Sequence, residues 1–127
     1  MVLVLEPEEK NAFLEAMADK YDRIILLCTS VKARAIEEIA KDYHIPISTC
    51  YRKVHELTSR KLLRVEKTIL TDTGKKYELF RSAIIDASVR FSPGEVLVEV
   101  TPRPRESDER LTSLWRTVQK EAYSPVG

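Results

Sequence analysis

Apolar and polar positions recur at helical spacing through the first third of the chain. Residues 8–18 combine an acidic first turn with a modest apolar stripe, which predicts a helix. Residues 19–31 contain a dense apolar run that periodicity alone allows as a buried helix or a buried strand. The helical neighbours favour a helix, which would be the first core helix of the domain.

Two short helices joined by a tight turn are predicted between residues 35 and 61. In the first, Ile36, Ile39 and Ala40 share one face, opposite charged residues. The pattern stops at Tyr43-His44-Ile45-Pro46, because Pro46 lacks a backbone donor and restricts the residue before it to extended geometry. His44 occupies a position that a left-handed backbone would suit, and histidine tolerates that conformation comparatively often. We therefore expect the chain to turn there.

The second helix of this pair is predicted to begin at Ser48 or Thr49, either of which is a preferred N-cap. Its inward stripe consists of Cys50, Val54, Leu57 and Lys61. The opposite face gathers Ser48, Arg52, His55 and Ser59. Such a face suits base edges and phosphates, so the pair is predicted to be a helix-turn-helix with its recognition helix at about Ser48–Arg60.

Beyond residue 61 the period changes to two, which predicts strands. Alternating residues 62–70, the turn-forming Thr71–Gly74 and a returning segment 75–82 make a hairpin over Leu62–Ser82, the wing of a winged helix. The competing interpretation is a helix over residues 74–87, and the strand is the favoured one. A second hairpin is predicted over residues 87–101, because Pro93-Gly94 separates two further alternating segments.

Prolines 102 and 104 predict a stiff connector, residues 102–106, before a last helix. The apolar residues of that helix fall on one narrow stripe: Leu111, Leu114, Trp115, Val118 and Ala122. Leaving them in water is unfavourable, so the helix either folds back on its own domain or pairs with a second copy. We favour the pairing. The fold class is thus α+β, with a winged helix-turn-helix at 1–101, the connector, and a C-terminal dimerisation helix within 107–127.

The length of 127 residues fits one folding unit. No apolar run approaches the ~18 residues of a membrane span, and the apolar start lacks a basic leader, so we expect a cytoplasmic protein without membrane contact. Net charge is +1, but its distribution is uneven. Residues 32–76 carry eleven basic and six acidic side chains, and this local excess favours a phosphate-binding surface.

Candidate DNA contacts follow from these patterns. Groups on the outward helix face are expected to contact bases: Ser48, Thr49, Arg52 and His55. Flanking and hairpin groups are expected to contact phosphate: Tyr51, Lys53, Ser59, Arg60, Arg64, Lys67, Lys75 and Lys76. The expected partner is double-stranded DNA, read by a homodimer.

Motifs of catalysis and of metal binding are lacking: there is no Gly-rich phosphate loop, HExxH, paired CxxC or GxSxG. His44 and His55 have no ligand-like neighbours in the sequence, so we expect no metal, no cofactor and no enzymatic activity. Cys28 and Cys50 fit core positions as small hydrophobes. A redox-sensing repressor that uses these two thiols is the alternative.

The order IA, IP, STCYR and LLRV across Ile39–Val65 resembles winged helix-turn-helix regulators of the ArsR-like type, particularly small archaeal ones. The resemblance covers about residues 20–85. It implies dimeric, sequence-specific DNA binding and transcriptional regulation. Metal-sensing members carry a cysteine motif on the helix before the recognition helix, and this chain has none in Ile36–Asp42, so metal sensing is not implied. The alternative function is a winged-helix protein-interaction module without DNA readout; the effector is not identified by the sequence.

Overall fold

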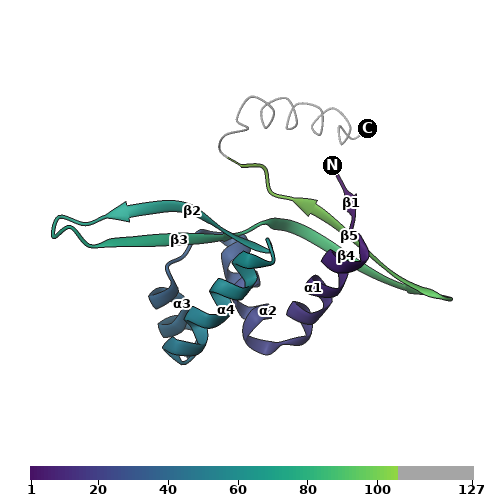
Figure 1. Cartoon of the computed structure of the whole chain (residues 1–127), viewed down its shortest axis with the longest axis horizontal. Coiled ribbons are helices and arrows are strands. Elements are labelled where there is room, and N and C mark those ends of the chain that lie inside the picture. Colours follow the sequence, from purple (N-terminus) through teal and green to yellow (C-terminus); the bar gives the residue numbers. More distant parts are fainter. Residues whose placement is uncertain (106–127) are drawn as a thin grey trace, which may run out of the picture.

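The computed structural model describes residues 1–105 of the chain. Helices lie along one side of two antiparallel hairpins that extend in opposite directions (Figure 1). The helices are α1 (Pro7–Ala18), α2 (Lys20–Val31), α3 (Ile36–Asp42) and α4 (Ile47–Ser59). The strands are β1 (Leu3–Val4), β2 (Leu63–Leu70), β3 (Lys76–Ser82), β4 (Ile84–Ser92) and β5 (Glu95–Pro102). The fold is α+β, and its helix-turn-helix followed by a hairpin is consistent with a winged helix.

Strands β2 and β3 form the predicted wing. They pair from Leu63 opposite Ser82 to Leu70 opposite Lys76, with a bulge between Val65 and Lys67. The alternative of a helix over residues 74–87 is wrong. Alternation turns Phe80 and Ser82 into the core, and residues 84–87, which completed the helical spacing, belong to β4.

The second hairpin is longer than predicted, and it acquires a third strand. Strand β4 begins at Ile84 rather than at residue 87, so Ala83 alone separates it from β3. The predicted turn is present, with Gly94 at φ +85°. The N-terminal Leu3 and Val4 pair with β5, giving the strand order β1-β5-β4. This pairing was not predicted, because two residues are too few for a detectable alternation.

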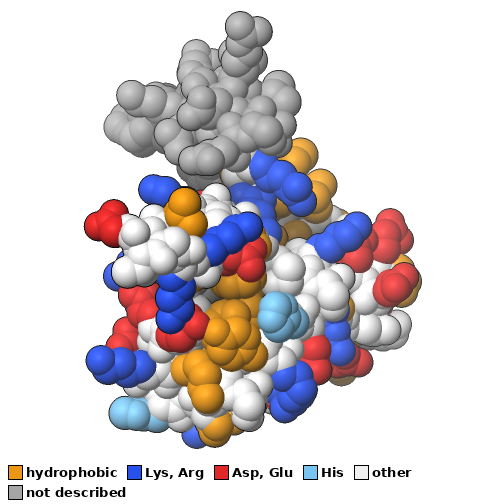
Figure 2. Space-filling model, turned by 60° about the vertical axis from the view of Figure 1, so that its left-hand side comes forward, with side chains coloured by type: hydrophobic (Ala, Val, Ile, Leu, Met, Phe, Trp, Pro, Cys, Tyr) orange, Lys and Arg blue, Asp and Glu red, His pale blue; other side chains and the backbone are white. Residues whose placement is uncertain are grey.

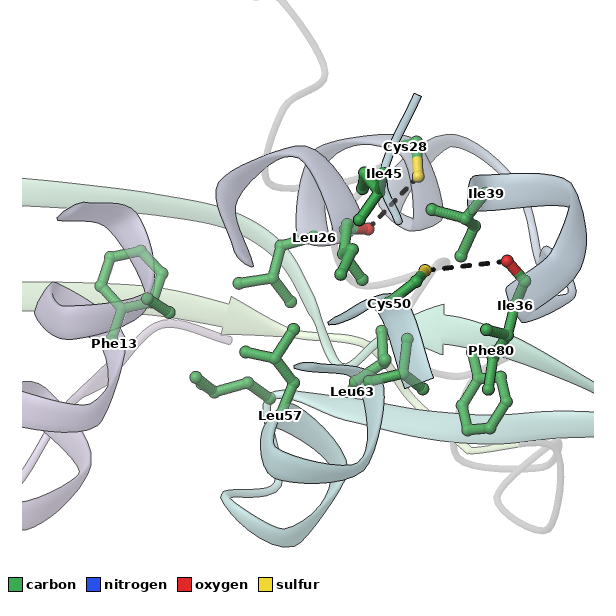
Figure 3. Close-up of a cluster of buried hydrophobic side chains, with 14 of the residues drawn as sticks. Phe13, Leu26, Cys28, Ile36, Ile39, Ile45, Cys50, Leu57, Leu63 and Phe80 are labelled. Carbon is green, nitrogen blue, oxygen red and sulfur yellow. Dashed lines mark hydrogen bonds between the residues drawn. The ribbon is translucent and has the colours of Figure 1, made fainter. Parts of the chain in front are cut away.

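The core lies where α2, α3 and α4 meet beneath the strands (Figure 3). Its fully buried large side chains include Ile25, Ile39, Leu57 and Leu63, and Phe13 of α1 closes one end. Of residues 19–31, all but the N-cap Asp19 are helical, as the neighbouring segments indicated. Burying each large apolar side chain contributes about 1.5–3 kcal/mol, so the apolar faces of the helix pair hold it against the strands.

The turn between α3 and α4 has the predicted geometry. His44 adopts a left-handed backbone with φ 55°. This reversal lets the Ile45 amide donate to the Ala40 carbonyl at 3.0 Å, which satisfies an orphan carbonyl at the end of α3. Ile45 is then buried. The left-handed turn at His44 therefore connects the buried face of α3 to a buried residue just before the next helix.

Helix α4 differs by one residue at each end from the recognition helix predicted at about Ser48–Arg60, and the predicted N-cap at Ser48 or Thr49 is wrong. Its N-cap is Pro46, with no capping side chain, so Ser48 and Thr49 lie inside the first turn. The extended backbone at Pro46 already directs the chain into the helix. At the other end Lys61 is exposed and left-handed, with φ 64°. The chain reverses there, and the Leu62 amide donates to the Leu57 carbonyl at 3.0 Å.

Strand β5 runs to Pro102, and the residue after it is held by the domain. Arg103 donates from Nε to the Ser82 carbonyl at 3.0 Å and from Nη2 to the Ser30 carbonyl at 2.9 Å. Burial lowers the pKa of its guanidinium. The first part of the expected connector is therefore packed against α2 and β3. The predicted dimerisation helix, with Leu111, Leu114, Trp115, Val118 and Ala122, lies outside the described residues.

The left-handed backbone at His44 predicts a substitution pattern. His44→Val should lower the free energy of unfolding by about 1–2 kcal/mol, because a β-branched side chain tolerates this conformation poorly. His44→Gly should be as stable as the natural protein or more so. Urea denaturation measures both. His55→Val, at an exposed site inside α4, is the control and should stay within about 0.5 kcal/mol. Equal unfolding midpoints for the Val and Gly variants at position 44 would contradict the role of the turn.

Candidate nucleic-acid interface

One face of α4 is buried and the opposite face is exposed, as the helical spacing predicts. Cys50, Val54 and Leu57 are buried, with exposed fractions of at most 1%, which anchors the helix on the core. The groups expected to contact bases lie on the other side: Ser48, Arg52 and His55 are exposed, and Thr49 is half-buried. The outward face therefore presents a guanidinium, an imidazole and hydroxyl groups to one region of solvent.

Aromatic and aliphatic side chains interrupt this polar face. Tyr51 and Ile47 are exposed by 38% and 50%, respectively, so the face is partly apolar. The rings of Tyr51 and His55 lie 6.3 Å apart. Figure 2 shows hydrophobic side chains gathered between basic and acidic ones, with a histidine beside them. Tyr51 also donates a hydrogen bond from its hydroxyl to Glu37 of α3.

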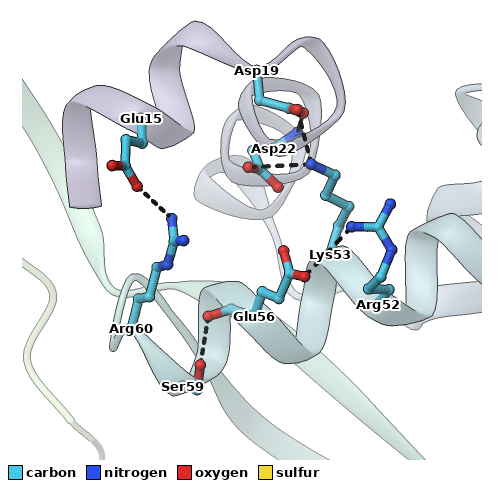
Figure 4. Close-up of polar contacts among 8 residues, drawn as sticks. All are labelled: Glu15, Asp19, Asp22, Arg52, Lys53, Glu56, Ser59 and Arg60. Carbon is cyan, nitrogen blue, oxygen red and sulfur yellow. Dashed lines mark hydrogen bonds and ion pairs between the residues drawn. The ribbon is translucent and has the colours of Figure 1, made fainter. Parts of the chain in front are cut away.

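Three basic side chains within and just after α4 pair with carboxylates, namely Arg52, Lys53 and Arg60 (Figure 4). Arg52 lies 3.4 Å from Glu56 one turn later, and Arg60 lies 3.3 Å from Glu15 of α1. Both pairs are solvent-exposed, so each contributes little to stability. They nevertheless lower the positive potential of the face. Ser59 donates to the Glu56 carbonyl at 2.8 Å.

Lys53 is directed inward, although it was predicted to contact phosphate. Its Nζ lies 2.8 Å from Asp19 and 3.7 Å from Asp22, and 13% of its side chain is exposed. The hydrogen bond to Asp19 raises the pKa of Lys53, and the same bond lowers the pKa of Asp19. Lys53 thus links the recognition helix to the N-terminus of α2, where Asp19 also caps the amide of Asp22.

Asp22 is the least satisfied member of this cluster. Burial raises the pKa of its carboxyl group. Within residues 1–105 its Oδ1 has no hydrogen-bond partner. The lysine is therefore the cation that allows a buried carboxylate here. The sequence contains Asp19 and Asp22 in the first turn of α2, but their proximity to residue 53 depends on tertiary packing.

The wing adds exposed lysines to the cations of α4. Lys67, Lys75 and Lys76 are exposed, and the tip between them is closed by a hydrogen bond from the Thr71 amide to the Lys75 carbonyl at 2.8 Å. The pKa of Glu37 is lowered by the Tyr51 hydrogen bond and, to a smaller extent, by the charge of Lys75.

Arg64 has a structural position rather than an outward one. It is half-buried on β2 and donates to the carbonyls of Arg103 and Pro104 at 2.8 and 2.7 Å. Its guanidinium therefore holds the end of β5 against the wing.

The two thiols are poorly suited to redox sensing. Cys28 and Cys50 are both buried and free (Figure 3), and burial raises the pKa of each to about 11. At neutral pH both are neutral thiols, which are weak nucleophiles. Their side chains pack in the core, as the sequence indicated.

Residues 1–105 contain no group of three or more His, Cys, Asp or Glu side chains that could hold a metal ion. Over the same residues no helix is long and apolar enough to cross a membrane.

Comparisons with known proteins identify no family. No family model matches the chain, and no curated protein matches it. Among solved structures, a crystal structure of an ArsR family transcriptional regulator aligns over 98% of this chain and 100% of that one, with 14% identity and a TM-score of 0.43. A similarity this low does not establish the fold or the function of this chain.

The inward lysine predicts a destabilising substitution with a distinctive pH dependence. Lys53→Met should lower the free energy of unfolding by about 2 kcal/mol at pH 7, because it leaves the Asp22 carboxylate buried without its cation. Because its pKa is raised in the folded protein, Asp22 binds a proton more readily there than in the unfolded chain, so lowering the pH stabilises the variant. The pair of Asp19 with Lys53 lowers the pKa of Asp19 and stabilises only the natural protein, and this stabilisation is lost as the pH falls. The free energies of unfolding of the variant and of the natural protein should therefore become more similar as the pH is lowered from 7 to 4.

Urea denaturation at a series of pH values measures this difference. The double variant Lys53→Met with Asp22→Asn should recover part of the loss, because the uncompensated charge is removed. If Lys53→Met lowered the free energy of unfolding by the same amount at every pH, and the double variant were no more stable, only the packing of the lysine stem would matter.

Proposed function

We propose that this protein is a DNA-binding transcriptional regulator that inserts α4 into the major groove and lays its wing along the backbone. The observation that carries the proposal is the arrangement of the two elements. An anchored helix presents Ser48, Arg52 and His55 outward, and the adjoining hairpin bears exposed lysines. Helices of this kind read base edges in the major groove, and lysines on an adjacent element contact phosphates.

The proposed roles divide between the two elements. Arg52 reads a base, with Ser48, Thr49 and His55 beside it, while Lys67, Lys75 and Lys76 bind phosphate. Tyr51, Ser59 and Arg60 lie at the edges of the helix and contact the backbone. We further propose that the regulator acts as a homodimer on two half-sites, to which the apolar stripe of the C-terminal segment contributes, as the sequence predicts. The resemblance to ArsR-like regulators agrees with these roles.

A second candidate is a protein-interaction module, and one observation favours it. The cations of α4 are paired with carboxylates, and the exposed Ile47 and Tyr51 make its face partly apolar. Binding to DNA separates the candidates. Selection from random duplexes at low salt should enrich a sequence if the protein reads DNA. No retention of any duplex at low salt would leave the interaction module as the better proposal.

Substitutions on the two elements should have different effects on DNA affinity. On the selected duplex, Arg52→Ala should weaken binding by about 1–3 kcal/mol and relax the preference at one base pair. Lys75→Ala should weaken binding to every sequence alike and reduce the salt slope by about 0.9. Fluorescence anisotropy at several salt concentrations measures both. Lys10→Ala, on the α1 side of the molecule, is the charge-matched control and should leave affinity and slope unchanged.

The ion pair on α4 predicts a gain of affinity. Glu56→Gln should strengthen DNA binding about two- to fivefold at low salt, because it removes a negative charge beside Arg52 and releases that guanidinium. The gain should disappear in the Arg52→Ala background and shrink as salt rises. Glu95→Gln, at the tip of the other hairpin, is the matched control. Weaker binding of the Glu56 variant would mean that the pair positions Arg52 rather than competing with DNA for it.

A further inference from the structure

Strand β4 leaves one edge of the three-stranded sheet unpaired. The order β1-β5-β4 places it at the end of the sheet, with β5 on one side and no strand on the other within residues 1–105. Its register with β5 is unbroken from Asp86 to Ser92. Such an edge presents a row of backbone donors and acceptors that can pair with another strand.

The apolar face of this sheet continues to the open edge. Val89 lies opposite Val98 and Phe91 opposite Val96, so these four side chains share one face. Val98 is fully buried in the core, whereas Val89 and Phe91 are exposed by 52% and 87%. The apolar surface thus extends beyond the part that the core covers and ends uncovered at β4.

The charges on β4 are symmetric about one residue. Asp86 and Arg90 lie two positions on either side of Ser88, on the face opposite to Val89. Neither charge has an ion pair among the described residues. Edge strands that avoid association usually carry lysine or proline, and Ile84–Ser92 contains neither.

We propose that β4 pairs antiparallel with β4 of a second copy of this chain, about a two-fold axis at Ser88. This register places Asp86 opposite Arg90 of the second copy, and Arg90 opposite Asp86. Ala87 then faces Val89 of the second copy on the apolar side. The strand is therefore complementary to itself in charge and in apolarity, as a two-fold interface requires.

The pairing would join two three-stranded sheets into one sheet of six strands. It hydrogen-bonds the open edge and places Val89 beside Ala87 of the second copy. The proposal does not rest on DNA binding, and it is distinct from the C-terminal stripe, which can contribute to the same dimer.

Cysteine cross-linking in the full-length chain tests the register. Residues directly opposite each other have Cβ atoms about 4.5–5.5 Å apart, so Ser88→Cys should form a covalent dimer on mild oxidation or with a short bis-maleimide. Asp86→Cys alone should not, because its symmetry mate lies about 13 Å away along the strand. A mixture of Asp86→Cys and Arg90→Cys should cross-link. The natural protein, whose two thiols are buried, is the control.

Charge reversal supplies an independent test by sedimentation equilibrium. Asp86→Arg and Arg90→Asp should each raise the dimer dissociation constant about tenfold or more, because each places like charges opposite each other twice. Mixing the two variants should restore association, since every pair is then opposite in charge. The double reversal in one chain should also restore it. Asp72→Arg, on the wing tip, is the control.

Three results would overturn the proposal: a monomeric full-length protein at high micromolar concentration, Ser88→Cys that cross-links no faster than Asp86→Cys, or charge variants that associate equally alone and mixed. A dimer that persists without cross-linking at position 88 would assign association to another surface. DNA retention by the same preparations is measured separately, so a failure here does not count against the proposed function.

Discussion

Burial of one stripe on α4 is the constraint on which the site depends. Cys50, Val54 and Leu57 are almost completely excluded from solvent, and a helix that buries this stripe must direct the residues opposite to it outward. The exposure of Arg52 and His55 therefore follows from core packing rather than from any local preference of their own. Left-handed residues just before and just after the helix, His44 and Lys61, bring Ile45 and Leu62 back into the same core. The outward face of α4 is thus fixed at three places by apolar contacts on its far side.

The positive charge of the outward face of α4 is smaller than its number of basic residues suggests. Arg52 and Arg60 are paired with carboxylates at the surface, and Lys53 is used inside, where it compensates Asp19 and Asp22. Among the cations expected to contact DNA, the exposed lysines Lys67, Lys75 and Lys76 lie on the wing. Surface pairs are weak and screened by salt, so separating Arg52 from Glu56 or Arg60 from Glu15 costs little. The inward lysine is different, because removing it from its carboxylates would leave a buried charge.

Local patterns predicted most of the fold, and tertiary contacts account for what they missed. The wing follows from its period of two, and the turn at His44 follows from the proline two positions later. The helix over residues 20–31 was predicted from its helical neighbours, because periodicity alone also allowed a buried strand. The N-cap at Pro46 and the reversal at Lys61 were missed because backbone geometry, not a capping side chain or the apolar stripe, sets those ends. The role of Lys53 could not be predicted, since its partner Asp19 is 34 positions away in the sequence. At the site, the sequence allowed us to infer which residues of the helix face are exposed. It did not allow us to infer which carboxylate pairs with each basic side chain.

The junction between the hairpins determines how a contact at β4 would affect the wing. Ala83 is the single residue between β3 and β4. Its amide donates to the Leu62 carbonyl at 3.0 Å, and its carbonyl accepts from the Arg103 amide at 2.8 Å. The neighbouring Ser82 is buried, and its hydroxyl donates to the Ile84 carbonyl at 2.9 Å. Because the junction is bonded on both sides, the wing and the β4 edge are held in one orientation. A two-fold axis at β4 would therefore set the separation of two wings through continuous strands rather than through a flexible linker.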